Sequence, residues 1–542
     1  MILVFTVILV ALIFTYTNGF HDTANSIATV VGTKVLTPRQ AIMLATVTNL
    51  LGAMTGAAVA KTIASGLVDT TGKFIPPSAS SGMLICALLA AIAWNLITWY
   101  FGLPSSSSHA LVGGLCGAAL ATAHGNWHAV IWSSMPAAGQ HWWNGGGILY
   151  KVVIPMILSP VLGFLIAFVL MAVLYILLQK WRPLTVTRTF GRAQLVSSAY
   201  MGFSHGTNDA QKTMGIIFLA LVAGTGGGNF DSLSHKWNFL YAPDPLGSIS
   251  AAQVELGHLS FKAGDKKRAY SFFQKAADGK NQTGRLLYAN ALKTGEGTKA
   301  NPILAEKILT QLEADKFDIT SVKPGTFISK KFQDLPASAP ESFNWLNQKA
   351  DGGSADAMLV LGVAYAKGDG VETNKEKALA LFEKAAGRNH PAAFYDLGLL
   401  YLNGIGVAQN DKKAEDLFRE CINKEAIPLW IKILCALTMA AGTAIGGWRI
   451  IRTLGHKLVK LQPVHGFAAE TAGASVLLGT AMMGMPVSTT HVITASIMGV
   501  GAAKRWSAMK WIVAEQIVWA WIFTLPVTAA IAYGLVKLVG MF

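Results

Sequence analysis

The chain has few charged residues and few cysteines. Of its 542 residues, 13% are charged and 52% are hydrophobic, which is too apolar for a single soluble domain and typical of a protein with many membrane spans. The four cysteines form neither a metal-binding spacing nor a disulfide framework. The sequence also lacks a nucleotide-binding glycine loop, a nucleophile elbow and a metal-binding helix, which argues against an enzyme.

Acidic residues are also scarce: the sequence has 29 acidic and 44 basic residues, for a net charge of +15. The basic excess lies in short clusters beside apolar segments, as the positive-inside rule predicts, so we exclude nucleic acid as a partner. The first apolar run has no basic leader. It continues into Asn18, Asp22 and Asn25 and not into a small-residue cleavage site, so we interpret it as a retained first span.

Apolar segments long enough to cross the hydrocarbon core, about 20 residues each, occur in two series. The first series is 1–32, 40–64, a broken helical pair at 82–124, and 148–179. The second series is 193–224, 427–447, a broken helical pair at 463–503, and 511–536. The predicted fold class is therefore all-α, a polytopic membrane protein built from two five-span repeats with broken helices.

The spacing of polar landmarks supports one duplicated unit. Asp22 and Pro104 are 82 residues apart, whereas Asp209 and Pro486 are 277 apart, and the difference of 195 matches a polar insertion at about 229–424. Five spans per copy is an odd number, so the second copy must enter the membrane from the opposite side, and the repeats are inverted. The predicted domains are 1–180 for the first repeat, 181–228 and 425–542 for the second, and 229–424 for the insertion.

The insertion has its own repeat. The segment 361–382 recurs 36 residues later at 397–418, with a Leu-Gly pair, a tyrosine, a Gly-x-Gly-Val turn, an alanine and a phenylalanine in the same places. This period and helix-turn-helix spacing indicate an α-solenoid, and the residues resemble the Sel-like branch of tetratricopeptide repeats. A degenerate copy runs through Gly257, Phe272 and Tyr288. Such a solenoid either binds a protein partner or is an extramembrane accessory, and both interpretations stay open.

Three basic clusters are expected in the cytoplasm. They are Lys180, Arg182, Arg188 and Arg192, then Arg449, Arg452, Lys457 and Lys460, then Lys504, Arg505 and Lys510. Because the first two clusters flank the spans that bracket the insertion, we predict that the insertion and both termini lie in the periplasm and the spans in a bacterial inner (cytoplasmic) membrane. A re-entrant segment at 193–224 would reverse this orientation.

Acidic and amide residues interrupt the first span of each copy. The sequence GFHDTAN at 19–25 puts an aspartate and an asparagine three positions apart, on one helix face, and SHGTNDAQK at 204–212 repeats an acid beside amides. A charged carboxylate in the membrane costs about 2.5–3.5 kcal/mol even on lenient scales, so an intramembrane aspartate is a functional hypothesis by default. Such an aspartate can take up a proton, or bind a cation together with amide and carbonyl oxygens.

A proline, a hydroxyl run and a histidine also recur, as PSSSSH at 104–109 and PVSTTH at 486–491. The hydroxyls cap the helix that follows, and the free N–H groups and positive dipole end of that helix suit an oxyanion. Two such helix ends related by inversion would face one small anion from opposite sides. Because hydroxyl and N–H groups carry no full counter-charge, the anion could still be released.

The pairing of GFHDTAN with SHGTNDAQK, and of PSSSSH with PVSTTH, resembles the inorganic phosphate transporter family over essentially all of the chain outside the insertion. The resemblance implies an inverted-repeat fold and symport of phosphate with protons or sodium. It implies that Asp22, Asn25, Asn208, Asp209 and Gln211 form the cation or proton sites. It implies that Ser105, Ser106, Ser107, Ser108, Ser488, Thr489 and Thr490 hold phosphate.

The resemblance has two departures. His21 stands where many sodium-coupled relatives have asparagine, which disfavours sodium coupling, and the solenoid is outside the usual family pattern. Bacterial members with a similar histidine are typically low-affinity, proton-coupled carriers that can take phosphate as a neutral complex with a divalent metal.

Several other polar residues are weaker candidates. His109 and His491 could relay protons, because imidazole titrates near neutrality, or could donate structural hydrogen bonds. Glu470, inside an apolar span, could be a further protonatable group in such a relay. Lys212 either neutralises phosphate or pairs with Asp209, and the sequence does not separate the two.

The sequence thus predicts a secondary active transporter of inorganic phosphate in symport with protons. The alternatives are a sodium-coupled phosphate or sulfate permease and, in another class, a membrane-anchored solenoid scaffold. No cofactor and no structural metal site is expected, and the coupling ion is H⁺ or Na⁺. The predicted partners are phosphate, the coupling cation, the lipid bilayer, a protein bound by the solenoid and a second copy in a homodimer.

Overall fold

The computed structural model of the chain consists of helices and their connections. It describes residues 1–68, 74–135, 142–226, 246–278, 281–314, 317, 339–368, 370–388, 390–423, 427–446, 450–451, 461–504 and 511–540. In these ranges extended backbone pairs only at two isolated bridges, Val68 with Val130 and Ser134 with Gly146. The all-α prediction is confirmed.

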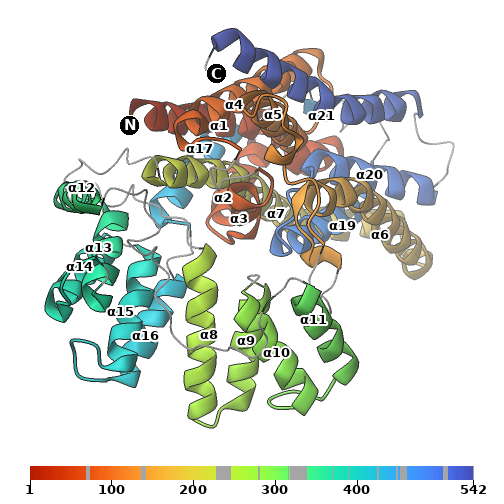
Figure 1. The fold of residues 1–542 in the computed structure, drawn as a ribbon. Coiled ribbons are helices and arrows are strands. Elements are labelled where there is room, and N and C mark those ends of the chain that lie inside the picture. The colour runs from red at the N-terminus through yellow and green to blue at the C-terminus, as the bar shows by residue number, and fades with distance from the viewer. Residues whose placement is uncertain are drawn as a thin grey trace. The chain divides into compact units, whose positions relative to one another are not determined.

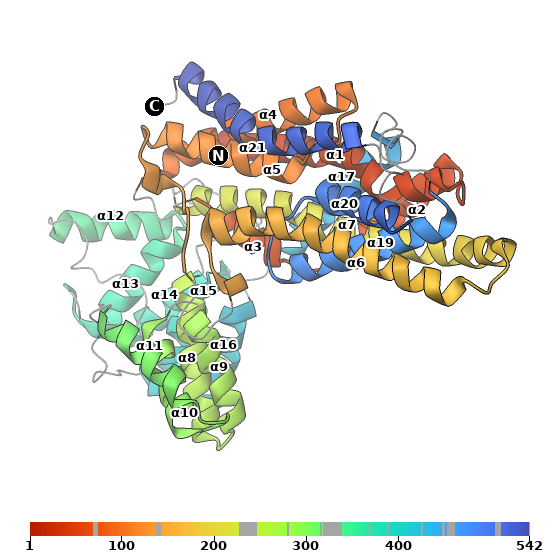
Figure 2. The same cartoon turned by 90° about the vertical axis from the view of Figure 1, so that its right-hand side faces the viewer.

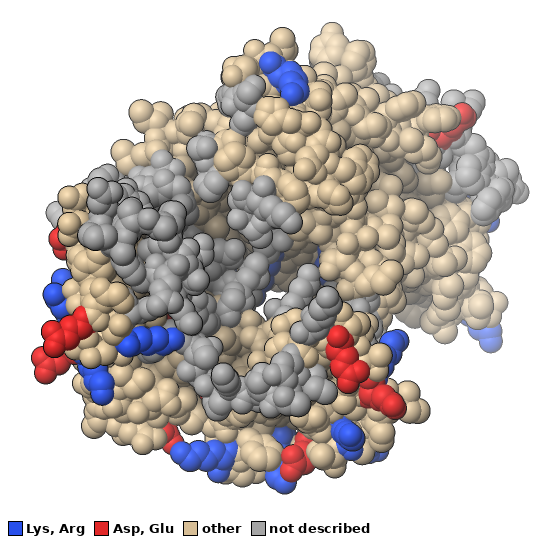
Figure 3. Space-filling model, viewed as in Figure 1, with Lys and Arg blue, Asp and Glu red and all other residues tan. Residues whose placement is uncertain are grey.

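The chain divides into two compact units. The first, which we call the membrane unit, comprises Ile2–Ser134, Gly145–Ala223 and Ile427–Phe542. The second, which we call the stacked-helix unit, comprises Gly224–Ala426 together with Met1 and Met135–Asn144. Figure 3 shows one face of the molecule, on which charged side chains gather over the stacked-helix unit and most of the visible membrane unit is uncharged.

The membrane unit contains long helices, labelled in Figure 1. They are α1 (Ile2–Gly32), α2 (Pro38–Ala53), α3 (Ala58–Ser65), α4 (Pro77–Phe101), α5 (Ser107–Thr122), α6 (Ile154–Leu178), α7 (Pro183–Gly226), α17 (Leu429–Ile445), α19 (Pro463–Met482), α20 (Thr489–Lys504) and α21 (Trp511–Val539). Short 3₁₀ turns at Trp127–Ala129 and Trp142–Asn144, and a π-helical turn at Leu149–Val153, lie between α5 and α6.

Four helices of the described chain are long and apolar enough to cross a bilayer: α1, α4, α6 with its preceding turn, and α21. The helices α2 and α3 satisfy the same criterion together, as one span bent by 68°. The span predicted at 40–64 therefore contains a bend, with Gly56 at φ 74° in the break. These helices make the chain a multi-pass membrane protein.

Each proline–hydroxyl run separates the two helices of a broken pair, as the sequence predicts. After α4, Gly102 adopts a left-handed conformation (φ 66°) and α5 begins beyond the N-cap residue Ser106. After α19, Gly484 does the same (φ 67°) and α20 begins at Thr489. Glycine suits both turns because a side chain would strain this conformation by about 1–2 kcal/mol.

The helix after each break packs against the last helix of the other half. α5 packs along α21, and α20 packs along α6 (Figure 2). Glycines allow the close approach, since a Cβ at Gly117 of α5 would lie 2.0 Å from Ala529 O, and one at Gly499 of α20 would lie 2.2 Å from Phe164 O. The helix that follows the break in each half thus makes an equivalent contact with the last helix of the other half.

The stacked-helix unit is a row of short helices. They are α8 (Leu246–Lys262), α9 (Lys266–Asp278), α10 (Gln282–Thr294), α11 (Pro302–Ala314), α12 (Ala339–Asp351), α13 (Ala355–Lys367), α14 (Lys375–Gly387), α15 (Pro391–Asn403) and α16 (Asp411–Asn423). Contacts run from α12 in order to α16, then from α16 to α8, and on to α11 (Figure 1). A buried core that includes Leu256 of α8 and Phe418 of α16 joins the two series, so the chain enters and leaves near the middle of the row.

The sequence repeat corresponds to a repeated glycine–phenylalanine contact. A Cβ at Gly362 would lie 2.6 Å from the Phe382 ring, and a Cβ at Gly398 would lie 2.5 Å from the Phe418 ring. In the degenerate copy the contact of Gly257 is with Phe273, at 2.3 Å. The predicted Phe272 is therefore one position wrong, because the connection between α8 and α9 is shorter than those of the clear repeats.

Candidate functional site

The two hydroxyl runs meet inside the membrane unit. Ser108 Oγ donates a hydrogen bond to Val487 O at 3.0 Å, so the first run contacts the second directly. The rings of His109 and His491, which follow the runs, have centroids 4.7 Å apart. The N-terminal ends of α5 and α20, each carrying the positive end of a helix dipole, therefore lie together.

Each run caps its helix in the same way. Ser106 Oγ accepts a hydrogen bond from the backbone N–H of His109 at 3.1 Å, and Ser488 Oγ accepts one from the backbone N–H of His491 at 3.3 Å. These serines satisfy one donor each at a helix start and leave other N–H groups of the first turn without a partner in their own helix.

Each run also contacts the buried aspartate of one long helix. Ser107 Oγ donates to Asp22 Oδ2 at 2.6 Å, and Thr489 Oγ1 donates to Asp209 Oδ2 at 3.5 Å. Ser107 and Thr489 hold the same place in their runs, two residues before the histidine. Both carboxylates are buried, each with 1% of its residue surface exposed. Equivalent contacts therefore join α5 to α1 and α20 to α7.

The residue three positions after each aspartate contacts the hydroxyl run of the other half. Asn25 Nδ2 donates to the hydroxyls of Thr489 and Thr490, at 3.1 and 2.9 Å. Lys212 Nζ donates to the hydroxyl of Ser108. Lys212 is thus the structural counterpart of Asn25. The sequence comparison paired the amide residues of the two motifs and therefore missed this equivalence.

Ionisable side chains gather where α1 and α7 meet. One ligand atom each of Asp22, His205 and Asp209 lie within 4.8 Å of one another, and all three residues are buried. Lys212 Nζ forms an ion pair with Asp209 Oδ1, so one of its predicted roles is observed. His21 Nδ1 lies 2.7 Å from Asp22 Oδ1. Two buried carboxylates this close repel each other unless protons or cations offset their charge.

His205 was not among the predicted site residues, although its place four residues before Asp209 puts it on the same face of α7. Its Nδ1 lies 3.0 Å from Asn49 Oδ1, and Asn49 Nδ2 donates to Thr443 Oγ1 at 3.2 Å, so the Asn49 oxygen is the acceptor. A neutral His205 then turns its Nε2 lone pair toward Asp209 Oδ2, 3.2 Å away. A proton or a metal cation between these two atoms would remove their repulsion.

Ser105 and Asn208 are sequence neighbours of residues in the Asp22–Asp209 site, but their own contacts differ. Ser105 Oγ donates to Thr98 Oγ1 at 2.8 Å, and Thr98 Oγ1 also lies 3.2 Å from His21 Nε2. The amide oxygen and nitrogen of Asn208 are buried and have no hydrogen-bond partner within the described part of the chain. Buried amides are normally paired, so Asn208 is available to a ligand.

Gln211 contacts a different part of the unit. Its Oε1 accepts the backbone N–H of Val59 at 2.9 Å, and its Nε2 donates to Thr207 O at 2.7 Å. The side chain therefore braces the bend between α2 and α3, and no hydrogen bond joins it to either aspartate among the described residues.

Glu470 lies in a second polar cluster. Its carboxylate accepts hydrogen bonds from Thr29 and Ser197 hydroxyls, both at 2.5 Å, and from Gln194 Nε2 at 3.2 Å. Thr29 follows Asp22 by seven residues, which is about 10 Å along α1. The structure therefore separates Glu470 from the aspartates.

The rings of the two histidines after the runs lie edge to face, and several of their ring nitrogens lack a hydrogen-bond partner within the described residues. Both ring nitrogens of His109 and Nε2 of His491 are without a hydrogen-bond partner within the ranges described above. The ring of His491 stacks on Trp521 with centroids 3.9 Å apart. In this part of the chain no hydrogen bond links either ring to Asp22 or Asp209.

Broken helices whose ends meet beside buried ionisable groups within membrane-spanning helices define a class of protein, the helical membrane transporters. The phosphate transporter family model matches residues 18–532. The chain belongs to the phosphate transporter family, whose members are transporters and not enzymes, and the resemblance recognised in the motifs is confirmed.

Relatives extend over the full chain. A Bacillus subtilis (strain 168) protein named a probable low-affinity inorganic phosphate transporter is 29% identical over 544 residues, 99% of this chain and 98% of that protein. A Rhizobium meliloti protein of the same name is 27% identical and covers 97% of this chain and 93% of its own length. A solved structure titled "The sodium-dependent phosphate transporter" covers 100% of both chains at 19% identity with a TM-score of 0.49.

Proposed function

We propose that the chain carries inorganic phosphate across the membrane in symport with protons that bind at the Asp22–His205–Asp209 cluster. Proton coupling is supported by one observation, the approach of His205 Nε2 to Asp209 Oδ2. A neutral His205 and an ionised Asp209 both present lone pairs at these atoms, so a proton between them is favoured. Membership of the phosphate transporter family supports the substrate.

The phosphate site combines helix ends with a full positive charge. The starts of α5 and α20 offer N–H groups and hydroxyls, and Lys212 brings an ammonium group to Ser108. An oxyanion bound here would be partly neutralised without being enclosed by several cations. This balance allows both binding and release.

Coupling follows from competition for the hydroxyl hydrogens. Ser107 and Thr489 donate to Asp22 and Asp209 while these are charged, and hydrogen bonds to charged acceptors are about twice as strong as neutral ones. Protonation of the carboxylates weakens that hold, so the hydroxyls are free to rotate toward a phosphate oxygen. By linkage, bound phosphate raises the affinity for the protons by the same factor.

Protons suit the cluster better than sodium does. Nitrogen atoms already lie against both carboxylates, namely His21 against Asp22, and Lys212 and His205 against Asp209. A sodium ion is a hard cation held by oxygen ligands, whereas the groups that lie against these carboxylates present nitrogen. A proton can instead be shared between imidazole and carboxylate without displacing any of these contacts.

A second candidate is transport of phosphate as a complex with a divalent metal, which would then be cargo. Two carboxylates and one imidazole within 4.8 Å of one another form a donor set that suits divalent cations such as Zn²⁺ or Mn²⁺. In this form the metal would occupy the place between His205 and Asp209 that a proton takes in the first candidate.

The test measures labelled phosphate flux into proteoliposomes containing the full chain. An inward proton gradient should drive accumulation, an equal sodium gradient should not, and excess sulfate should compete weakly. Accumulation that needs sodium, or none with either gradient, would refute proton symport. Uptake that stops with a chelator and resumes with Zn²⁺ or Mn²⁺, with equal metal uptake, would establish the second candidate.

We also propose that the stacked-helix unit lies in the periplasm. The first basic cluster, Lys180 to Arg192, is exposed just before and within the start of α7. Gly191 lies beside Val35 in the connection between α1 and α2, so Lys34 in that connection and Arg39 at the start of α2 add positive charge at the same end. The second cluster, Arg505 and Lys510 are outside the described residues. Protease added to spheroplasts should cleave the unit, whereas a unit cleaved only after lysis would reverse the orientation.

A further inference from the structure

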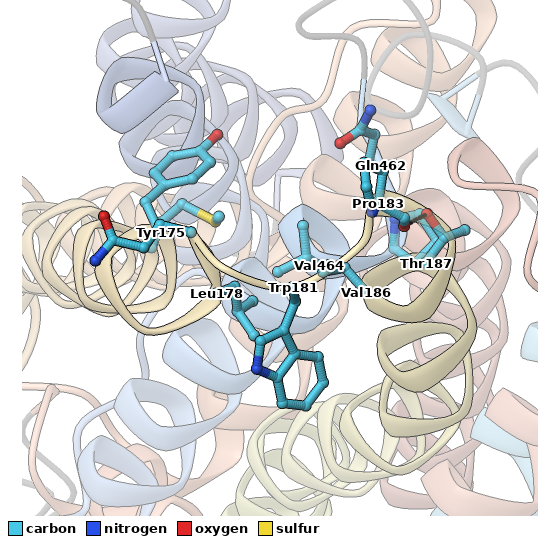
Figure 4. A pocket seen from close by; sticks show the side chains of 11 residues that line it. Tyr175, Leu178, Trp181, Pro183, Val186, Thr187, Gln462 and Val464 are labelled. Atoms are coloured by element: carbon cyan, nitrogen blue, oxygen red, sulfur yellow. Dashed lines mark hydrogen bonds between the residues drawn. The ribbon is translucent and has the colours of Figure 1, made fainter.

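A cavity of about 240 Å³ lies where α6 ends and α7 begins. Its walls come from the end of α6, the short connection to α7, the start of α7 and the start of α19. Figure 4 shows Tyr175 on one side, Leu178 and Trp181 in the middle, and Val186 and Val464 beside them. None of the residues that line it belongs to the Asp22–Asp209 site.

The lining of the cavity is mostly apolar, with Gln179, Thr187 and Gln462 as its polar side chains and two aromatic residues among the rest. Among the described residues no charged side chain lines it, and Leu178, Val186 and Val464 contribute aliphatic surface. Tyr175 and Trp181 are 38% and 46% exposed. Aromatic residues of this kind, polar at one end and apolar at the other, gather at the level of lipid headgroups.

The surroundings of the cavity are strongly basic. Lys180 and Arg182 flank Trp181 in the sequence and are exposed, and Arg188 and Arg192 follow on α7. Within the described residues none of these four side chains has an ion-pair partner, and the sequence has no aspartate or glutamate from residue 151 to 208. Lys180 and Arg182, next to the lining residues Gln179, Trp181 and Pro183, therefore bring positive charge to the cavity that no ion pair within the described residues offsets.

The size of the cavity restricts what it can hold. Pockets that enclose a whole small molecule measure about 300–1,000 Å³, so 240 Å³ holds only part of one. A membrane lipid fits this description, because one acyl chain can enter while the rest stays in the bilayer. Ile176, Leu177 and Leu184, each next to a lining residue in the sequence, are exposed and suited to the surrounding lipid.

We propose that this cavity binds an acyl chain of an anionic phospholipid whose phosphate group is held by Lys180 and Arg182. Basic pockets between membrane helices on the cytoplasmic side bind such headgroups. The apolar walls explain retention of the chain, and the unpaired cations explain selection of the charge. The proposal does not depend on the coupling ion or the substrate of the transporter.

The test uses a phosphatidylglycerol brominated in its acyl chains, because bromine quenches nearby tryptophan fluorescence. The full chain is reconstituted in zwitterionic liposomes that contain a small, fixed fraction of the brominated lipid. The signal of Trp181 is the difference between the parent and Trp181→Phe. We expect the brominated phosphatidylglycerol to quench Trp181 several-fold more than an equally brominated phosphatidylcholine does.

Matched variants separate charge from shape. Arg182→Gln should reduce the preference for phosphatidylglycerol about 5-fold, the effect expected of one basic residue near an anionic headgroup, whereas Arg39→Gln should leave it unchanged. Val186→Phe should fill the cavity and reduce quenching by both lipids. Val196→Phe, at a position 71% exposed on the same helix, should not. Phosphate uptake by each variant checks that it folds.

Two results would overturn the proposal. Equal quenching of Trp181 by the two brominated lipids would show that the cavity does not select an anionic headgroup. Unchanged quenching in Val186→Phe would show that the lipid chain lies outside the cavity.

Discussion

At the scale of single residues, Lys212 is the side chain on which the buried charges depend. It is 1% exposed, pairs with Asp209 and donates to Ser108. Lys212→Gln leaves the carboxylate without its cation, and removing one partner of a buried pair costs about 3–5 kcal/mol. We expect a clear fall in the melting temperature of the purified chain.

The double variant Asp209→Asn/Lys212→Gln is the control for this prediction. Because it removes both charges, it should recover most of the lost stability, although it should not transport. A double variant no more stable than Lys212→Gln would show that the ion pair is not what stabilises this region.

Ser107 provides a second prediction at this scale. Ser107→Ala removes the hydroxyl that donates to Asp22 and that we assign to phosphate, and a hydrogen bond to a charged group is worth about 1.5–3 kcal/mol, or roughly 10–100-fold in rate. The initial rate of phosphate uptake should fall by about that factor. Ser475→Ala, whose exposed hydroxyl donates to Thr471 O in its own helix, should keep its rate. Equal rates in the two variants would remove Ser107 from the site.

At the scale of helices, close contacts between glycine and backbone hold the broken pairs in place. Gly117→Ala would put a methyl group 2.0 Å from Ala529 O, so α5 and α21 must separate. Gly534→Ala, on α21, meets nothing within 4 Å and should be neutral or stabilising by up to about 1 kcal/mol through helix propensity. We expect Gly117→Ala to lower both melting temperature and uptake, and a variant that behaves like Gly534→Ala would contradict the tight packing.

The helices also show where local patterns suffice and where they do not. Both breaks at the hydroxyl runs follow from proline and capping residues that are close in sequence. The bend between α2 and α3 was not predicted, because a single glycine such as Gly56 is a weak signal. Gln211, which braces that bend, is 152 residues from its partner Val59.

At the scale of the whole molecule, the stacked-helix unit starts and ends at neighbouring points. α8 and α16 run antiparallel, because Lys262 near the end of α8 pairs with Asp411 at the start of α16 at 2.7 Å. The start of α8 therefore lies alongside the end of α16. A unit with adjacent ends can interrupt a membrane domain without separating the spans on either side.

This arrangement predicts that the unit can be removed. Replacing residues 246–423 by a short Gly/Ser linker should leave proton-driven phosphate uptake within a few-fold of the parent, since every residue of the Asp22–Asp209 site lies in the membrane unit. Surface expression measured alongside uptake controls for misfolding. Loss of uptake by a chain that still reaches the membrane would assign the unit a part in transport.

The sequence by itself determined the all-α membrane class, the positions of both helix breaks and the pairing of Asp22 with Asn25 on one face, because these depend on composition and on residues a few positions apart. Only the tertiary structure decided that Ser107 meets Asp22 across 85 residues and Thr489 meets Asp209 across 280. It also brought His205 into the site and placed Glu470 elsewhere. Such contacts depend on which helix faces pack together. Helix packing joins segments that are far apart in the chain, and the local sequence of one segment does not indicate its partner.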